Sequence, residues 1–285
     1  MSEIKETSDR SQRFSIKSSQ AECHRVQTYR FSGQKTIRAA ADQKHHLLGT
    51  VVLLWGSIHG NEPAGYWFLS DLVESFQRRG KPSGRSWRTD CAVWVVPTSN
   101  PCGLRQQTRE SEGVDLNRGF TDGRNALPER LTRRASGQAN AILEQQIRSA
   151  RSQYATVWVV DIHEAWGWIR DRQGSIGSAL HVDPADPVAW TMSERMIARV
   201  NSCLNLLGRF NFMVEPDQYE EGGTLGAHIQ WLRNETGPMH GLNCLHYILI
   251  EITGQHNVQS REVRTRQLKH LIYSLMDSTV FEHSR

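Results

Sequence analysis

Four apolar runs constrain the fold of this chain more than any other feature of its sequence. They cover residues 50–55, 91–97, 155–162 and 247–254. Nearly every position in them is apolar, which is typical of strands buried on both faces. Segments with the helical spacing of apolar residues separate these runs, at 63–78, 136–151, 187–207 and 259–276. This alternation predicts an α/β domain with a mixed, mostly parallel central sheet and helices on both faces.

Length and composition predict one domain, at 21–285, after a flexible polar tail at 1–20. The net charge of +4 is spread along the 285 residues, which argues against a nucleic-acid partner. The five cysteines form no Cys-x-x-Cys pair, which fits a reducing compartment. No apolar run has transmembrane length, and the first residues lack the apolar core of a secretory signal. We therefore expect no membrane partner and a cytoplasmic location.

The loop after the run at 50–55 carries His59 and Glu62. In an open α/β sheet, ligand sites form at the carboxyl ends of the strands. A histidine and a glutamate on such a loop can bind one cation, and both are ligands of catalytic zinc sites. The pair alone is weak evidence, because a histidine and a glutamate near a turn are more often solvated.

Two further residues strengthen the prediction of a metal site. His163 follows the run at 155–162, so it should emerge at the same edge of the sheet as Glu62. With His59, these residues form the two-histidine, one-glutamate set of a catalytic zinc site. Glu251 interrupts the apolar run at 247–254, where burial should raise its pKa and suit it to act as a general base. A buried ion pair is the alternative interpretation of Glu251.

A long stretch at 98–128, predicted to lack regular structure, adds the remaining motifs. It reads Asn100-Pro101-Cys102-Gly103, then an arginine, then Gly113-Val114-Asp115-Leu116-Asn117-Arg118-Gly119-Phe120. Together with His59, Glu62, His163 and Glu251, these motifs follow the order of the zinc carboxypeptidase family. The chain resembles the carboxypeptidase A kind, and within the family its succinylglutamate desuccinylase/aspartoacylase branch and bacterial murein-peptide carboxypeptidases. Cys102 departs from the pattern, because the family has an aspartate there.

The resemblance implies a zinc carboxypeptidase-like catalytic domain and a role for each matching residue. His59, Glu62 and His163 would bind one Zn²⁺ per chain, which polarises the scissile carbonyl group and acidifies the attacking water. Glu251 would accept the proton of that water and pass it to the leaving amine. Asp115 would accept a hydrogen bond from His59 and orient its ring.

The resemblance also implies residues that hold the substrate. Asn117 and Arg118 would bind its free carboxylate, for which the planar guanidinium group is well shaped. An arginine would stabilise the negative charge that develops on the carbonyl oxygen. Arg105 is favoured over Arg109 for this role, and Arg109 would then bind substrate. Tyr219 is the candidate for the mobile tyrosine of the family.

These residues predict a zinc metallohydrolase that cleaves an amide bond next to a free carboxylate. The substrate would be a small peptide, as for a metallocarboxypeptidase, or an N-acyl amino acid, as for a deacylase of the succinylglutamate desuccinylase/aspartoacylase type. A catalytically inactive, ligand-binding homologue is a further alternative, and the complete set of ligands, base and arginines argues against it. The specificity pocket depends on the conformation of residues 215–245.

Overall fold

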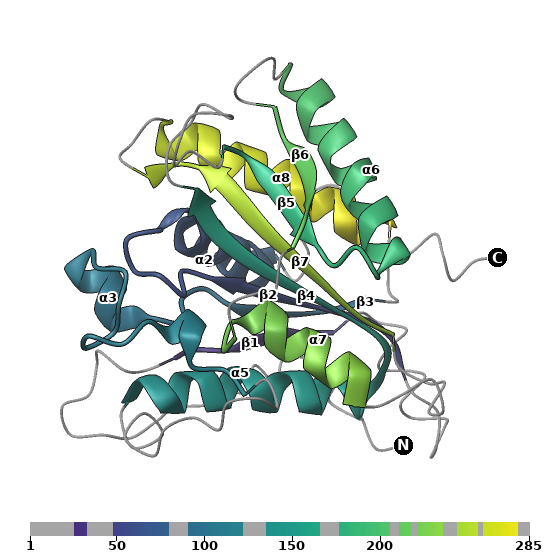
Figure 1. Ribbon diagram of the computed structural model, residues 1–285. Helices are drawn as coiled ribbons and strands as arrows, with labels where there is room; N and C mark the ends of the chain where they lie inside the picture. The colour runs from purple at the N-terminus through teal and green to yellow at the C-terminus, as the bar shows by residue number, and fades with distance from the viewer. Residues whose placement is uncertain are drawn as a thin grey trace, which may run out of the picture.

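A seven-stranded sheet runs through the part of the chain that the computed structural model describes (Figure 1). The described residues are 26–32, 48–79, 91–121, 135–165, 177–205, 211–217, 222–235, 244–255 and 259–278. The order across the sheet is β1-β3-β2-β4-β7-β5-β6. The strands are β1 (Tyr29–Phe31), β2 (Leu48–Gly56), β3 (Cys91–Val96), β4 (Tyr154–Ala165), β5 (Ala179–Val182), β6 (Met213–Pro216) and β7 (Cys244–Thr253). The tail expected at 1–20 lies outside the described residues.

The four longest strands, β2, β3, β4 and β7, form the centre of the sheet and run parallel to one another. β2 pairs with β3 on one side and β4 on the other, and β4 pairs with β7, all in the parallel sense. β1 is antiparallel to β3, and β5 is antiparallel to β7. The prediction of a single α/β domain with a mixed, mostly parallel sheet is therefore confirmed.

Helices cover both faces of this sheet (Figure 1). On one face lie α2 (Ala64–Arg79), α6 (Pro187–Cys203) and α8 (Arg261–Ser278). On the other lie α5 (Ala135–Arg151) and α7 (Leu225–Glu235). Alternate residues of each central strand enter the two cores, so Val52 and Leu54 of β2 contact one helical layer and Val51 and Leu53 the other. Burial on both faces explains why these strands are apolar at consecutive positions.

Two differences from the predicted elements matter for the site. β4 continues to Ala165, so His163 lies within the strand, paired in register with Glu251 of β7, rather than after its end. The stretch expected to be structureless contains α3 (Pro101–Gln106) and the short 3₁₀ helix η1 (Leu116–Arg118). The side chain of Asn100 caps α3, and the side chain of Asp115 caps η1. Side-chain caps of this kind stabilise helices too short to show periodicity in the sequence.

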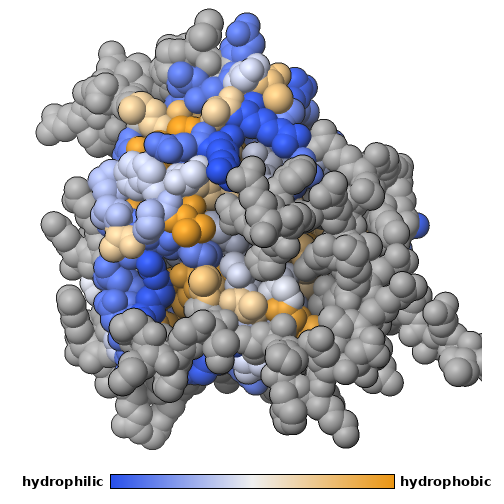
Figure 2. Space-filling view, turned by 90° about the vertical axis from the view of Figure 1, so that its right-hand side faces the viewer, coloured by the Kyte–Doolittle hydropathy of each residue, from blue (hydrophilic) through white to orange (hydrophobic). Residues whose placement is uncertain are grey.

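The topology brings the predicted site residues to one side of the sheet. His59 and Glu62 follow β2, and the neighbouring strands β4 and β7 carry His163 and Glu251. The carboxyl ends of these strands meet at the left of Figure 1, near α3. Figure 2 shows the opposite side, where the described surface is largely hydrophilic with small hydrophobic patches. Among the described residues, none of the helices has the length and apolar character needed to span a membrane.

Candidate active site

A pocket of about 300 Å³ lies at the carboxyl ends of the central strands. Four of its polar residues come from three neighbouring strands or the loops after them. His59 and Glu62 follow β2, His163 lies in β4 and Glu251 lies in β7. Its other polar lining residues include Arg109, Asn117, Arg118, Glu164, Asp217 and Gln255. The pocket therefore brings together most of the residues that the sequence singled out from distant positions.

Glu62 lies between the two histidines. One carboxylate oxygen is 3.0 Å from Nδ1 of His59, and the other is 3.0 Å from Nδ1 of His163. The imidazole rings face each other edge to face, with centroids 4.7 Å apart. All three side chains are buried, and one donor atom from each lies within 4.8 Å of the others. Nitrogen and carboxylate donors that converge in this way suit one divalent cation.

The outer nitrogen of each histidine contacts a second carboxylate. Nε2 of His59 is 3.2 Å from Asp115, and Nε2 of His163 is 3.1 Å from Asp161. A carboxylate at this position accepts the Nε2 proton and leaves the Nδ1 lone pair for a metal ion. Asp115 thus lies where the sequence analysis expected it. Asp161 was missed as a partner, although its place two residues before His163 on a strand puts both side chains on the same face.

The electrostatics of this cluster favour a cation. Burial alone would raise the pKa of Glu62, but the neighbouring His163 and His59 lower it well below its usual range. Burial would lower the pKa of His163, but Asp161 and Glu62 raise it well above its usual value. The buried carboxylates thus stabilise positive charge between them, as a proton or as a metal ion. The residues fit the divalent metal site that the sequence predicts.

Glu251 lies in the same pocket in a different electrostatic state. Burial raises the pKa of its carboxyl group to about 8; His163 opposes this shift, and the charges of Glu62 and Asp161 add to it. Its Oε2 atom is buried and has no hydrogen-bond partner among the described residues. A carboxyl group whose pKa lies in this range exchanges its proton close to neutral pH, as general acid–base catalysis requires. The buried ion pair considered for Glu251 is not found among the described side chains.

The loop motifs hold the loop that carries His59 in place. Asn100 donates hydrogen bonds from Nδ2 to the carbonyl oxygens of Ile58 and Arg109, each at 3.2 Å, and its Oδ1 accepts from the backbone of Gly103. Gly60 packs so closely on the backbone of Gly103 that a Cβ atom on Gly60 would lie 1.9 Å from its carbonyl carbon. The Asn-Pro-x-Gly motif therefore fixes the loop that carries His59.

The structure separates the two arginines that were considered for the oxyanion. Arg109 lines the pocket, donates from Nε to Asp115 at 3.0 Å and lies 3.7 Å from Glu62. Arg105 is exposed at the end of α3 and lines a different pocket, with Tyr29 and Thr98. The geometry thus places Arg109, and not the favoured Arg105, beside the predicted metal ligands.

Asn117 and Arg118, the residues predicted to bind the substrate's carboxylate, lie on η1. The Oδ1 atom of Asn117 accepts a hydrogen bond from the backbone of Leu225 at 3.0 Å, so the amide nitrogen of Asn117 is not used in that bond. Gly223 has a φ of +78°, and a Cβ atom there would lie 2.6 Å from the carbonyl oxygen of Arg118. This contact and the link to α7 fix η1 against the turn that precedes the helix. Tyr219 lies outside the described residues.

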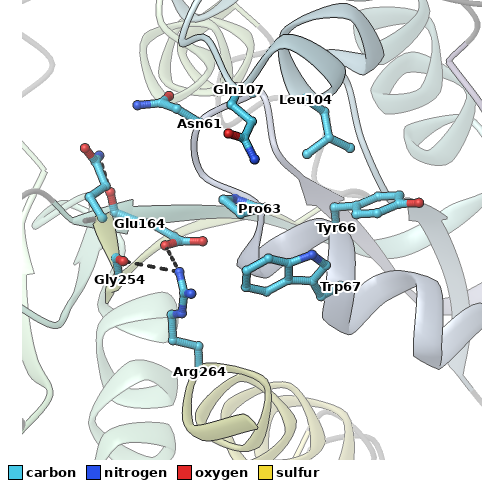
Figure 3. A pocket seen from close by; sticks show the side chains of 11 residues that line it. Asn61, Pro63, Tyr66, Trp67, Leu104, Gln107, Glu164, Gly254 and Arg264 are labelled. Atoms are coloured by element: carbon cyan, nitrogen blue, oxygen red, sulfur yellow. Dashed lines mark hydrogen bonds and ion pairs between the residues drawn. The ribbon is translucent and has the colours of Figure 1, made fainter. Parts of the chain in front are cut away.

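Sequence reasoning missed a second group of polar residues beside the candidate metal ligands. Gln255 donates from Nε2 to Glu62 at 3.1 Å and to the carbonyl oxygen of Glu164 at 2.6 Å. Glu164 forms a buried ion pair with Arg264 of α8, which lies over the ring of Trp67 (Figure 3). Gln255 had no signal in the sequence, because it follows a strand without any motif. It lies at the boundary between the metal site and a neighbouring pocket.

That neighbouring pocket has a volume of about 550 Å³ and shares Glu164 and Gln255 with the 300 Å³ pocket. Figure 3 shows Tyr66 and Trp67 of α2 on one side of it and Leu104 and Gln107 at the top. Tyr66 and Leu104 also line a third pocket, of about 770 Å³, which contains Arg105. The three pockets thus adjoin one another along the surface that leads away from the metal site.

Comparison with protein families gives one match. Residues 49–167 match the model of the succinylglutamate desuccinylase/aspartoacylase catalytic domain. This segment contains His59, Glu62, Arg109, Arg118 and His163. The predicted resemblance to this branch of the zinc carboxypeptidases is thereby confirmed, and the match to a catalytic domain indicates a hydrolase. A search of curated protein sequences found no significant match.

Solved structures share the fold. Tripeptide-bound cell shape determinant Csd4 from Helicobacter pylori superposes with a TM-score of 0.61 at 15% identity, over 89% of this chain and 55% of that one. An mDAP-bound form of Csd4, described as a D,L-carboxypeptidase, gives 0.58 at 15% identity, over 88% and 54%. A proposed metallopeptidase from Shewanella denitrificans gives 0.57 at 14% identity, over 94% and 84%. The chain thus spans about half the length of Csd4.

Proposed function

We propose that this chain, a hydrolase of the succinylglutamate desuccinylase/aspartoacylase and zinc carboxypeptidase type, removes the C-terminal residue of a small peptide in a zinc-dependent reaction. One observation carries the proposal. The 300 Å³ pocket combines a buried His59–Glu62–His163 donor set with two arginines and Glu251, whose Oε2 atom has no hydrogen-bond partner among the described residues. A metal site, a base and cationic groups for anions are the parts that hydrolysis of an amide beside a carboxylate requires.

Each side chain would perform one task in the reaction. The metal ion, when bound by His59, Glu62 and His163, would polarise the scissile carbonyl group and acidify the attacking water. Glu251 would accept the proton of that water on Oε2 and transfer it to the leaving nitrogen. Arg109 would donate to the carbonyl oxygen as negative charge develops there.

The substrate's carboxylate would bind at η1. Arg118 can donate two parallel hydrogen bonds to a carboxylate, and the amide nitrogen of Asn117 can add a third. Both residues line the pocket that contains Glu251. The scissile bond would then lie between the carboxylate-binding residues and the metal ligands.

The adjoining pockets favour a peptide over a short acyl group. The 550 Å³ pocket contains neither Asn117 nor Arg118, so a substrate held by its carboxylate would extend its other end into that space. Trp67 and Tyr66 offer apolar surface there, and Gln107 and Asn61 offer polar groups. A small acyl group would leave most of this volume unused.

Deacylation of an N-acyl amino acid is the second candidate, and the family match over residues 49–167 favours it. Both reactions use the same metal ligands, base and carboxylate-binding residues, and they differ in the group on the other side of the scissile bond. Hydrolysis rates for blocked dipeptides, tripeptides and N-acetyl or N-succinyl amino acids would separate them. An inactive ligand-binding homologue would cleave none of these and is disfavoured by the complete site.

The metal site makes a prediction about composition. The purified protein should contain about one zinc ion per chain, because three donors of catalytic type converge in it. His163→Ala should lose the metal, whereas Asp161→Asn should weaken metal affinity by ~10–100-fold because it removes an acceptor that orients the ring. Elemental analysis and titration with a zinc indicator measure both. Stoichiometric zinc in His163→Ala would contradict the assignment of the ligands.

Carboxylate binding makes a second prediction. Arg118→Lys keeps the positive charge but loses the paired hydrogen bonds, so kcat/KM for peptides with a free C-terminus should fall while amidated peptides change little. Arg118 is exposed in this structure, so the charge pair would be desolvated only once the substrate covers it; truncating one partner of a desolvated pair costs ~2–5 kcal/mol, and lysine should recover only part of this. Steady-state kinetics on matched free and amidated peptides provide the measurement. If the parent enzyme cleaves both forms equally well, Arg118 does not bind the carboxylate.

A further inference from the structure

Glu62, the middle residue of the His59–Glu62–His163 cluster, has two contacts at each of its carboxylate oxygens. Its Oε1 atom lies 3.0 Å from Nδ1 of His59 and accepts a hydrogen bond from Nε2 of Gln255 at 3.1 Å. Its Oε2 atom lies 3.0 Å from Nδ1 of His163 and accepts from the backbone N–H of Glu164 at 3.1 Å. Each oxygen therefore contacts one imidazole nitrogen and one donor from outside the cluster.

The two outer donors fix the orientation of the Glu62 carboxylate. A carboxylate oxygen has two lone-pair positions, so one outer donor at each oxygen leaves one position that faces a histidine. Without such donors the group could turn, because the last torsion of a glutamate side chain has only broad minima. Arg109 approaches the same oxygen as Gln255, but its guanidinium nitrogen is 3.7 Å away, which is too far for a hydrogen bond. The amide of Gln255 therefore limits rotation at Oε1, as the backbone of Glu164 does at Oε2.

The position of Gln255 is itself set by the chain around it. Its Nε2 atom also donates to the carbonyl oxygen of Glu164 at 2.6 Å, so the two hydrogens of the amide have separate acceptors. The preceding residue, Gly254, packs against the buried ion pair of Glu164 and Arg264 (Figure 3). A Cβ atom on Gly254 would overlap with Oε2 of Glu164, and the carbonyl oxygen of Gly254 accepts from Arg264 at 3.2 Å. These contacts hold the end of β7 against β4 and direct Gln255 towards Glu62.

The backbone of Glu62 has support of its own. The hydroxyl group of Ser57 donates to the carbonyl oxygen of Glu62 at 2.9 Å, and the backbone N–H of Glu62 donates to the carbonyl oxygen of His59 at 3.2 Å. Neither hydrogen bond involves Gln255. Loss of the Gln255 amide should therefore turn the carboxylate and leave the loop in place.

We propose that Gln255 is a positioning residue for the metal site, which holds the Glu62 carboxylate in the orientation that binds the ion. The inference rests on the proposed function, because it concerns the same site, and it adds a residue that acts through Glu62. Gln255 is assigned no contact with the metal or the reacting atoms. Hydrogen-bond partners of metal ligands typically contribute ~10–100-fold to metal affinity.

The test compares zinc affinities, measured by competition with a chromophoric chelator. Gln255→Met removes both hydrogen bonds of the amide, keeps a side chain of similar length and should bind zinc ~10–100-fold more weakly than the parent. Gln255→Asn, whose amide is one methylene closer to the backbone, should also bind zinc more weakly. Gln77→Met is the matched control, because Gln77 is exposed on α2 and lines the 770 Å³ pocket, which contains none of the candidate metal ligands. Unchanged affinity in both Gln255 variants, or an equal loss in Gln77→Met, would overturn the proposal.

Cobalt(II) in place of zinc separates positioning from a structural role. The visible absorption of bound cobalt depends on the arrangement of its ligands, so the spectrum of Gln255→Met at saturating cobalt should differ from that of the parent. If Gln255 only supports the fold, the spectrum stays the same and only the melting temperature of the metal-free protein falls, which would overturn the proposal. Neither measurement requires turnover. A parent that binds zinc but cleaves nothing therefore refutes the proposed reaction alone, whereas a parent that binds neither metal refutes both proposals.

Discussion

Glu251→Gln should remain folded and keep its zinc while turnover falls by ~10²–10⁴-fold, the usual effect of removing a general base. Glutamine has the shape of glutamate but cannot accept a proton at the position of Oε2, the atom that has no partner among the described residues. Its thermal stability should equal or exceed that of the parent. The replacement removes a carboxyl group whose pKa is raised to about 8 by burial and neighbouring charges, so no favourable ion pair is lost.

Glu164→Gln provides the matched comparison for this prediction. Glu164 and Glu251 lie on neighbouring strands, but Glu164 forms a buried ion pair with Arg264. Breaking a buried pair leaves an uncompensated charge and costs ~3–5 kcal/mol, so Glu164→Gln should lower the melting temperature. Kinetics, zinc analysis and calorimetry on both variants test the contrast. If the melting temperature of Glu251→Gln falls as far as that of Glu164→Gln, a structural role for Glu251 is favoured.

The sequence predicted the four longest strands better than the short strand β5 and the helix α7. β2, β3, β4 and β7 are buried on both faces, so their sequences are continuously apolar and unmistakable. β5 has only four residues, too few for a recognisable pattern, and was not predicted. α7 was also missed, because the glycines that precede it suggested a loop; the hydrogen bond from its first residue to Asn117 joins segments 108 positions apart.

In the candidate site, too, some residues could be identified from the sequence and others could not. Its candidate metal ligands were predictable because residue type and the ends of buried strands together limit where a ligand set can form. The choice between Arg105 and Arg109 depends on the path of the chain after α3, because Gln107, the residue that caps the end of the helix, has a left-handed conformation. No periodic pattern encodes that turn. Asp217 and Gln255 belong to the site through tertiary contacts alone, so the sequence could not identify them.

Replacing Arg109, which follows that turn, should have the second large effect on activity. Arg109→Gln should lower kcat by ~10²–10³-fold on every substrate, free or amidated, because an oxyanion donor acts on the transition state of each. Arg105→Gln should lower kcat far less, since Arg105 is exposed and lines a pocket that does not contain the metal ligands. Steady-state kinetics on the two variants, measured side by side, compare two arginines that are four positions apart in the sequence.

Arg109 also contacts Asp115, which in turn contacts His59, so a loss of activity in Arg109→Gln has a second explanation. Zinc content separates the two causes. If Arg109 stabilises the oxyanion, the variant retains zinc and its KM changes little while kcat falls, the pattern of an interaction made only in the transition state. If it only positions His59 through Asp115, zinc affinity falls and added zinc restores turnover. A variant with full zinc and full turnover, together with an inactive Arg105→Gln, would return the oxyanion role to Arg105 and show that the loop rearranges when substrate binds.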